Sequence, residues 1–285
     1  MSNPTRRPAA ALRYLAAIPA LLWWLSCAAQ VTLNAVPGGL VEVPLATLNR
    51  PRPQAFFGRE RVLVMRFGRQ WVGLVGLPLT LVPGSYLIRA RLEDGQDAVS
   101  RQFTVYPRQE EEPPVVHVRQ PPLDAPPAAL TWREPLDAKL PLEPPVPLPA
   151  QPVFGHYRQT ADSRTGLRSA YVDFVTFQVA SDTAVKAPDD GVVAGIEIHD
   201  SGAYVLIDHG MGLFSRVGPV TRTELQVSQP VKAGQMIGRM VLDTADKSKP
   251  LYWWVFLNGA AVNPFLMSRI EKAPIRDAGS GTSPG

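Results

Sequence analysis

The sequence predicts an all-β protein that is divided into two domains. Short runs of β-branched, aromatic and other apolar residues recur along the chain, and turn-forming Gly, Pro, Asp and Asn separate them. A proline-dense stretch in the middle divides these runs into two groups. No heptad pattern occurs, so the sequence does not predict a coiled coil. This division of 285 residues favours two modest domains over one large core.

Residues 1–29 have the order of segments that is typical of a secretory signal. Three arginines come first, and no acidic residue occurs before Glu42. An apolar run follows at residues 14–25, and small residues occupy 26–29. The apolar run is shorter than the about 20 residues that a membrane span needs. We therefore expect a periplasmic or exported protein.

Cys27 allows a second interpretation, because lipoprotein signals also end at a cysteine. Such signals usually carry leucine three residues before it, where this chain has Trp24, so lipid anchoring is the less favoured alternative. An uncleaved N-terminal anchor is another alternative. Signal cleavage would remove the only cysteine and with it any disulfide or thiol chemistry.

The charge of the chain argues against nucleic-acid binding. Cleavage after residue 29 removes three arginines and no acid, so the formal net charge falls from +4 to +1. A nucleic-acid binder would show a basic surplus or a clustered basic stripe, and neither occurs. We expect membrane contact only through the export signal.

Residues 30–107 are predicted to form a β-sandwich-like domain. Turn pairs such as Pro83-Gly84 and Asp94-Gly95 separate short strand-like runs, as in sandwiches. No catalytic spacing occurs in this domain, so a packing or spacer role is favoured over ligand binding. The strand-like runs cover residues 61–66, 71–75, 85–92 and 102–106.

Residues 108–152 are predicted to form a proline-rich linker. Proline fixes φ and has no backbone donor, so regular helix and central strand are excluded over most of the stretch. An extended, semi-rigid spacer is the expected state. Leu130 and Trp132 are apolar residues that could dock part of it on a domain surface. A recognition motif for a proline-binding partner is the less favoured alternative.

Residues 153–270 are predicted to form a second β domain, and residues 271–285 a disordered polar tail. The strand-like runs of this domain cover residues 174–179, 191–198, 203–207 and 252–257.

Six short motifs run through the second domain: Phe154-Gly155, Val172-Asp173-Phe174, residues 185–193, residues 205–210, residues 231–238, and Asn258-Gly259 with Val262-Asn263-Pro264. In order and spacing these motifs resemble the LytM/lysostaphin-type zinc endopeptidases, which cut peptide cross-links in peptidoglycan and have a duplicated hybrid motif. The resemblance implies a LytM peptidase-like β fold for residues 153–270. The N-terminal domain is similar, less specifically, to one that precedes this peptidase domain. That likeness is carried by residues 36–39, 61–64 and 76–79.

The resemblance implies a zinc site built from a His-x-x-x-Asp pair and the second His of a His-x-His strand. A hydrolytic zinc needs about three protein ligands and one open position for its water. Here Ser169 occupies the first ligand position, Asp173 the second and Tyr252 the third. Only one of the three positions keeps a ligand of the family's type. We therefore expect no zinc cofactor, although the family would use one.

The two catalytic histidines that the resemblance implies are also replaced. One position, in a Tyr-x-His segment, is Pro219, and the other, the first His of His-x-His, is Pro250. Proline has no side chain that can hydrogen-bond or move a proton. A general base must reach its proton directly or through one water. The sequence therefore predicts that no catalytic residue remains at these positions.

The remaining histidines offer an alternative ligand set. His209 lies in an Ile-Asp-His-Gly motif, where the family has no zinc ligand, and His117 lies in the linker. A working metallopeptidase would need Asp173 with two ligands from elsewhere, such as His156 or His199. Metal sites need clustered ligands, so surface or structural roles are favoured for all these histidines.

Asp173, Tyr252 and Trp254 are the candidates for binding in the cleft. Strand alternation puts Tyr252 and Trp254 on one face and Trp253 on the other. Their rings could stack on sugar or peptide, although core filling after loss of the metal is slightly favoured. For Asp173, a relic that accepts hydrogen bonds from its neighbours is favoured over a cleft contact.

These observations predict a catalytically inactive envelope protein that binds peptidoglycan or regulates a cell-wall hydrolase or division protein. Degenerate LytM-type domains act as activators of wall amidases, but such activators tend to carry coiled coils or wall-binding repeats, which this sequence lacks. One alternative is an active zinc metalloendopeptidase with an altered ligand set. Another is a structural envelope protein whose cleft is filled by Tyr252 and its neighbours.

Overall fold

The computed structural model describes seven stretches of the chain, and for residue 98, residues 157–162 and residues 166–170 it describes only the backbone. The signal predicted at residues 1–29 and the tail predicted at residues 271–285 lie outside the described residues. The stretches are residues 34–91, 98–109, 130–151, 153–162, 166–221, 223–240 and 248–270.

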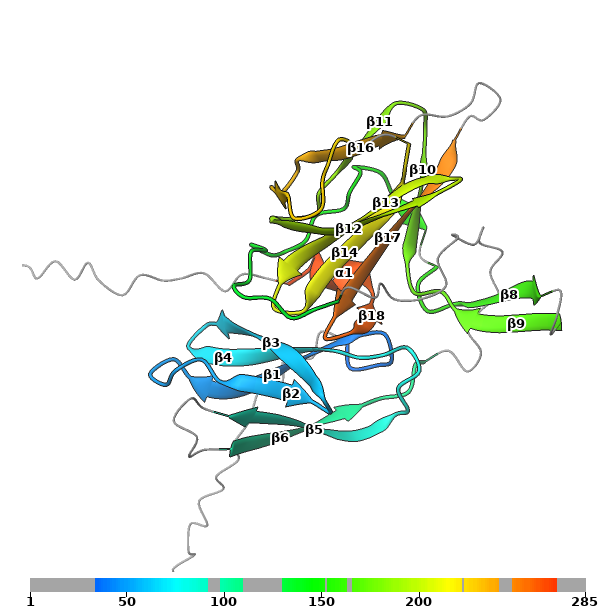
Figure 1. The fold of residues 1–285 in the computed structure, drawn as a ribbon. Coiled ribbons are helices and arrows are strands. Elements are labelled where there is room, and N and C mark those ends of the chain that lie inside the picture. Colours follow the sequence, from blue (N-terminus) through cyan, green and yellow to red (C-terminus); the bar gives the residue numbers. More distant parts are fainter. Residues whose placement is uncertain are drawn as a thin grey trace, which may run out of the picture.

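The N-terminal domain is an antiparallel sheet in the order β1-β4-β3-β2-β5-β6, and it curls so that β1 contacts β6 (Figure 1). The apolar residues of alternate positions, such as Val41, Val43 and Val64, face the inside of the curl and form its core. The four strand-like runs predicted from the sequence correspond to β3 to β6. The strands are β1 (Leu40–Thr47), β2 (Gln54–Phe57), β3 (Glu60–Phe67), β4 (Gln70–Gly76), β5 (Gly84–Arg91) and β6 (Ala98–Val105).

The C-terminal domain is built on an antiparallel sheet in the order β15-β12-β13-β14-β17-β10-β7, with β18 paired to β17. A β11–β16 pair packs beside it, a β8–β9 hairpin projects from it, and α1 follows β18 (Figure 1). Its four predicted runs correspond to β10, β12, β13 and β17. The elements are β7 (Ala150–Gln151), β8 (Tyr157–Asp162), β9 (Gly166–Tyr171), β10 (Val175–Val179), β11 (Thr183–Lys186), β12 (Gly191–His199), β13 (Gly202–Gly210), β14 (Leu213–Val220), β15 (Pro230–Val231), β16 (Met236–Met240), β17 (Lys249–Leu257), β18 (Ala260–Val262) and α1 (Pro264–Met267).

Strand β17 separates two apolar clusters, because its side chains alternate between the faces of the sheet. Trp253 and Val255 point into the main core. Tyr252, Trp254 and Phe256 point to the opposite face and belong to a smaller aromatic cluster. The alternation predicted for Tyr252, Trp253 and Trp254 is therefore present in the fold.

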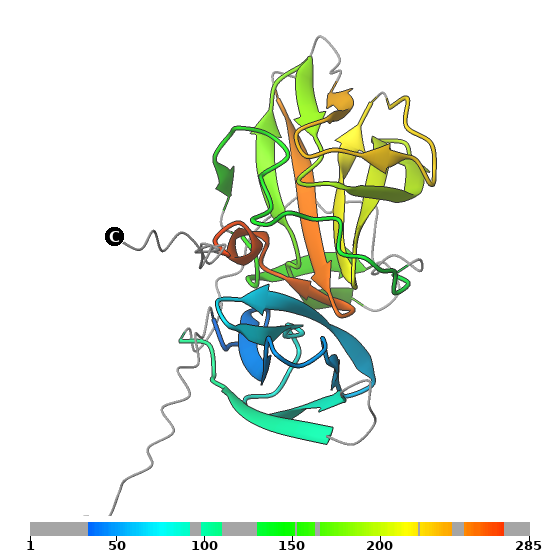
Figure 2. The ribbon, with the colours of Figure 1, turned by 90° about the vertical axis from the view of Figure 1, so that its left-hand side faces the viewer.

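The described part of the proline-rich stretch, residues 130–151, is extended and packs along the C-terminal domain, and we call it the strap (Figure 2). Leu140, Leu142 and Val146 are almost fully buried in the main core of that domain. Its backbone pairs with the domain, for example where the N–H of Leu142 donates to the carbonyl of Met267 at 3.2 Å. The sequence predicted that this stretch is a spacer between the domains. In the structure, the strap instead contributes side chains to the main core of the C-terminal domain.

The two domains meet where the β17–β18 turn contacts β4 (Figure 2). Leu40, Leu63 and Leu74, on the outer face of the N-terminal sheet, join the main core of the C-terminal domain. The side chain of Asn258 forms two hydrogen bonds with the backbone of Gly76, accepting from its N–H at 2.7 Å and donating to its carbonyl at 3.0 Å. A shared core and a reciprocal buried pair of bonds fix the orientation of the domains.

The strap also contacts the N-terminal domain through Glu134. Its carboxylate pairs with Arg52 at 2.5 Å and with Arg61 at 2.6 Å. The Arg61 guanidinium also lies over the Trp132 ring, 4.3 Å from its centroid. Among the described residues, no helix is long and apolar enough to cross a membrane.

Candidate functional site

Most of the positions that the resemblance assigns to zinc and catalysis gather around one end of β17. Pro250 and Tyr252 lie in β17, where Tyr252 pairs with Gly218 of β14 and Pro250 with Gln178 of β10. Pro219 follows Gly218 in β14. The adjacent strands β14 and β17 therefore bring Pro219, Pro250 and Tyr252 together.

The other two positions lie before β10. Ser169 is in β9, opposite Gln159 of β8, and the structure describes only its backbone. Asp173 lies between β9 and β10, next to Phe174. Phe174 packs against the rings of Tyr252 and Trp254, so Asp173 sits beside the aromatic face of β17.

Aromatic rings occupy this face of the sheet. Phe174 packs edge-on against Tyr252 at 5.2 Å between ring centroids, and it lies 5.2 Å from Trp254. Tyr204 lies edge-on to Trp254 at 6.1 Å. Tyr252 is 3% exposed, Trp254 2% and Tyr204 1%. Because these rings are buried against one another, the structure favours core filling over stacking on a ligand.

Gly218 makes room for this packing. A Cβ at that position would lie 2.6 Å from Cδ1 of Tyr204 and 2.8 Å from the carbonyl oxygen of Ala203. Real Cβ contacts are not that short, so the Tyr204 ring can pack in this position only because residue 218 is a glycine. In the resembled family this segment reads Tyr-x-His, and here it reads Val217-Gly218-Pro219.

Asp173 is engaged by this aromatic cluster. The indole Nε1–H of Trp254 donates to Oδ1 of Asp173 at 3.2 Å. The carboxylate therefore accepts a hydrogen bond from a neighbouring side chain.

Sequence reasoning missed a partly buried ion pair on the same face of the sheet. Arg216 of β14 is 3% exposed, and it donates to Oε1 of Glu197 in β12 at 3.0 Å. Its guanidinium also lies 5.6 Å from the ring centroid of Trp254, which is its partner across the β14–β17 pair. A charged residue inside an apolar strand was the only sequence signal of this arrangement.

The residues at the family's zinc positions do not fit the metal. Tyr252 is packed among aromatic rings, and the Asp173 carboxylate accepts an indole N–H. Within the described stretches, no three His, Cys, Asp or Glu side chains gather to hold a metal ion. His199 packs edge-on against Tyr204 at 5.6 Å. His156 and His199 therefore do not complete a three-ligand group with Asp173.

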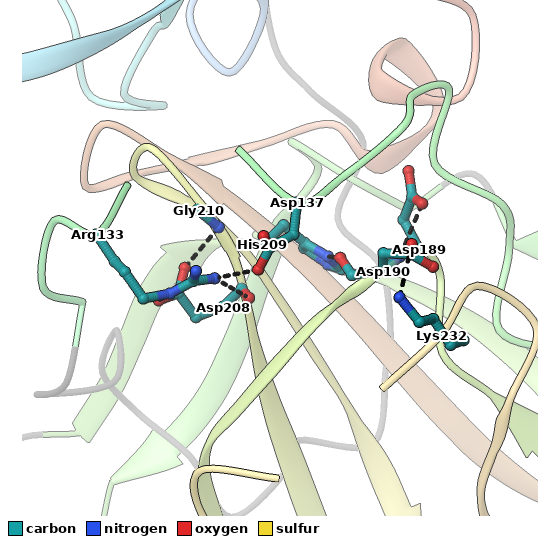
Figure 3. A network of polar contacts seen from close by, with 8 residues as sticks. All are labelled: Arg133, Asp137, Asp189, Asp190, Asp208, His209, Gly210 and Lys232. Atoms are coloured by element: carbon teal, nitrogen blue, oxygen red, sulfur yellow. Dashed lines mark hydrogen bonds and ion pairs between the residues drawn. The ribbon is translucent and has the colours of Figure 1, made fainter. Parts of the chain in front are cut away.

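The Ile-Asp-His-Gly motif has a structural role at the strap (Figure 3). Arg133 of the strap donates to Oδ2 of Asp208 at 2.7 Å and to its carbonyl oxygen at 2.9 Å. Arg133 also pairs with Asp137 at 2.8 Å. The backbone N–H of Gly210 donates to Oδ1 of Asp208 at 2.7 Å. The charged residue of the motif thus orders both its own turn and the strap.

His209 is fully buried beneath this network. Its Nδ1 lies 2.7 Å from the carbonyl oxygen of Asp190, so Nδ1 carries the proton. Its Nε2 lies 2.9 Å from Oγ of Ser215 and accepts from that hydroxyl. Burial lowers the pKa of His209, so the ring is neutral in the fold.

The Pro-Asp-Asp-Gly segment before β12 also binds the strap, and Figure 3 shows its Asp190 paired with Lys232. Oδ2 of Asp189 accepts from the backbone N–H groups of Lys139 and Leu140, both at 2.8 Å. Asp190 accepts from the N–H of Ala233 at 2.8 Å and pairs with the Lys139 ammonium at 3.1 Å. The Ala233 bond, with Lys139 and Lys232, lowers the pKa of Asp190 to about 2.

Comparison with known families follows the division into two domains. The sequence model of peptidase family M23 matches residues 172–264, and that of the M23 N-terminal domain matches residues 34–105. Together they cover more than half of the chain. The chain belongs to peptidase family M23. This confirms the resemblance to the LytM-type enzymes and the all-β fold with an M23 domain at the C-terminal end.

Solved structures of M23 proteins are similar to this chain. A Pseudomonas aeruginosa protein assigned to peptidase M23 is 25% identical, with a TM-score of 0.62, and the match covers 83% of this chain and 96% of that one. Lysostaphin from Staphylococcus simulans is 20% identical, with a TM-score of 0.34, over 50% of this chain and 59% of its own. Helicobacter pylori Csd3 is 15% identical, with a TM-score of 0.38, over 85% and 79%. A comparison with curated proteins finds no match.

Proposed function

We propose that this M23-family protein does not cleave peptidoglycan and acts in the cell envelope as a non-catalytic protein. The observation that carries the proposal is the hydrogen bond from Trp254 to Asp173 within a buried aromatic cluster. The family's remaining zinc ligand is engaged by an indole, and Tyr252 takes the place of another ligand inside the cluster. Pro219 and Pro250 supply no group that could move a proton. Metal-activated hydrolysis therefore lacks both its ligands and its general base.

The envelope role follows from family membership and from the export signal expected at residues 1–29. The partner would be peptidoglycan or a cell-wall hydrolase or division protein. Because Tyr252 and Trp254 are buried, this contact would be made outside the former cleft. The same burial supports a second candidate, a purely structural envelope protein with a closed cleft.

A peptidoglycan digestion assay tests the proposal. Purified sacculi are incubated with the exported chain, with and without added zinc, and released muropeptides are quantified by chromatography. An M23 peptidase with an intact His and Asp ligand set is the positive control. We expect no release above buffer from this chain.

If the natural protein does digest sacculi, the Asp173→Ala variant tests whether that activity needs a metal held by Asp173. Zinc-dependent digestion by the natural chain that disappears in Asp173→Ala would overturn the proposal in favour of an altered ligand set. Cosedimentation with the same sacculi separates the two non-catalytic roles. Saturable binding supports a wall-binding protein, and its absence directs the search to protein partners.

A further inference from the structure

Strand β12 forms an open edge of the C-terminal sheet. Within the described residues, the backbone partners on its outer side end at Val193: β15 pairs with Gly191 and Val192, and Val193 bonds with Ser228 and Gln229. Between Gly195 and His199 the strand pairs with β13 on its inner side. No other described residue forms a backbone hydrogen bond with this part of β12. Exposed N–H and C=O groups along an edge are a template for another strand.

The two faces of this edge have different chemistry. Ile198 is 73% exposed and pairs with Ala203, so it lies on the side of the main core. Ile196 lies on the same side and packs against that core. Glu197 pairs with Tyr204 and therefore faces the aromatic cluster. The edge thus presents an apolar side chain on one face and a carboxylate on the other.

Glu197 has capacity for a further cation. Its Oε1 accepts from Arg216 at 3.0 Å, whereas Oε2 is buried and has no hydrogen-bond partner among the described residues. A buried acceptor without a partner is costly, about 1–3 kcal/mol, so a new donor there would be favourable. The Glu197 side chain as a whole is 34% exposed, so a cation at the edge can approach the carboxylate, and a rotation of that side chain would bring Oε2 to it.

We propose that the edge of β12 between Gly195 and His199 binds an extended segment of a partner protein as an additional strand. The segment would place apolar side chains against Ile198 and a lysine or arginine against Glu197. Main-chain hydrogen bonds supply affinity in this mode of recognition, and alternate side chains supply specificity. The inference rests on the proposed non-catalytic function and names the chemistry of the partner.

The charge of Glu197 argues against a second copy of this chain as the occupant. Antiparallel pairing of two β12 edges centred on Glu197 would set the two carboxylates directly opposite each other. Like charges in that position destabilise a strand pair. A basic, β-forming segment from another protein is complementary at the same position.

A labelled heptapeptide with valine at alternate positions and a central lysine is the probe, with a central glutamate in the matched control peptide. Binding to the exported chain is measured by fluorescence anisotropy, and the bound site by hydrogen exchange. We expect the lysine peptide to bind about threefold more tightly than the glutamate peptide. The amides of Gly195 to His199 should gain protection on binding.

The Ile198→Lys variant, with Val82→Lys as its control, locates the interaction. Both natural side chains are exposed, Ile198 at 73% and Val82 at 71%, so both variants should keep the natural melting temperature. We expect Ile198→Lys to weaken peptide binding about tenfold, because lysine on an edge blocks strand addition. Val82→Lys should leave binding unchanged.

Three results would overturn the inference: no peptide binding, equal binding by natural protein and Ile198→Lys, or protection confined to other segments. A dimer in analytical ultracentrifugation that Ile198→Lys disrupts would also overturn it, in favour of a second copy. These outcomes are independent of peptidoglycan digestion. Digestion by the protein refutes the proposed function, whereas no digestion with no strand addition refutes this inference alone.

Discussion

The indole Nε1 of Trp254 lies 3.2 Å from Oδ1 of Asp173 and donates a hydrogen bond to it. The two residues are 81 positions apart in the sequence, and Trp254 belongs to β17, the strand in which Pro250 and Tyr252 replace two of the family's histidines. The carboxylate that would bind zinc in an M23 peptidase is thus a hydrogen-bond acceptor within an aromatic cluster. This relationship links the sequence changes at Tyr252 and Pro250 to the local packing.

Replacement of Trp254 by phenylalanine should destabilise the fold more than replacement of its neighbour Trp253. Both side chains are buried, but Trp254 donates to Asp173 and lies near Arg216, whereas Nε1 of Trp253 has no hydrogen-bond partner among the described residues. We expect Trp254→Phe to cost about 1–2 kcal/mol more than Trp253→Phe. Urea unfolding of both variants measures the difference in unfolding free energy. Equal losses in the two variants would mean that the contact between Trp254 and Asp173 does not stabilise the fold.

Removal of Arg133 should release the strap. Arg133→Met loses two bonds to Asp208 and one to Asp137, and it leaves the Asp208 carboxylate, whose side chain is 8% exposed, without its cation. We expect a loss of about 2–3 kcal/mol. Arg239→Met, which breaks the exposed pair with Asp182, should change stability by less than about 0.5 kcal/mol. Limited proteolysis should also show faster cleavage within residues 130–151 in Arg133→Met.

Stability should fall as the pH drops below the ordinary histidine pKa, and His209 should contribute to the fall. Burial lowers the pKa of His209 in the fold below 6.5, whereas the unfolded chain takes up a proton near that value. The unfolded state then binds more protons, so stability is lost as pH decreases from about 7 towards the lowered pKa.

His209→Gln should flatten the dependence of unfolding free energy on pH in this window, although the variant is less stable overall. A natural slope in His209→Gln would show that other groups cause the pH dependence.

Asn258 should be the residue on which the domain junction depends most. Asn258→Ala removes both bonds to Gly76 and leaves a buried N–H and a buried carbonyl without partners. We expect a loss of about 2–4 kcal/mol in urea unfolding. Asn263→Ala, which loses one helix-capping bond to Phe265, should cost about 1 kcal/mol. A smaller loss in Asn258→Ala than in Asn263→Ala would contradict this role.

The strands and the face that each side chain of β17 occupies could be predicted from the sequence, because both follow from local periodicity. The apolar run at residues 252–257 predicted β17, and alternation placed Tyr252 and Trp254 together. The replacement of the family's ligands at Ser169 and Tyr252 was also readable, since it needs only the order of motifs.

The packing around the site could not be predicted, because it depends on residues far apart in the chain. Tyr204 fills space only because Gly218, on the neighbouring strand, lacks a Cβ. Nothing local indicates that Arg216 pairs with Glu197. The strap shows the same limit. Proline content correctly predicts an extended chain, but the burial of Leu140 depends on the apolar core of the C-terminal domain and on Asp189, which binds its backbone N–H.

Zinc binding by the purified protein is the most direct test of the central claim. Metal content is measured by elemental analysis after equilibration with zinc and gel filtration, and affinity by titration calorimetry, with Asp173→Ala as the matched control. We predict that the protein retains no stoichiometric zinc. We also predict that titration with micromolar zinc gives the same result for the natural protein and for Asp173→Ala, with no heat of binding that depends on Asp173. One tightly bound zinc per chain, lost in Asp173→Ala, would contradict the account and show that Asp173 leaves Trp254 to join a working metal site.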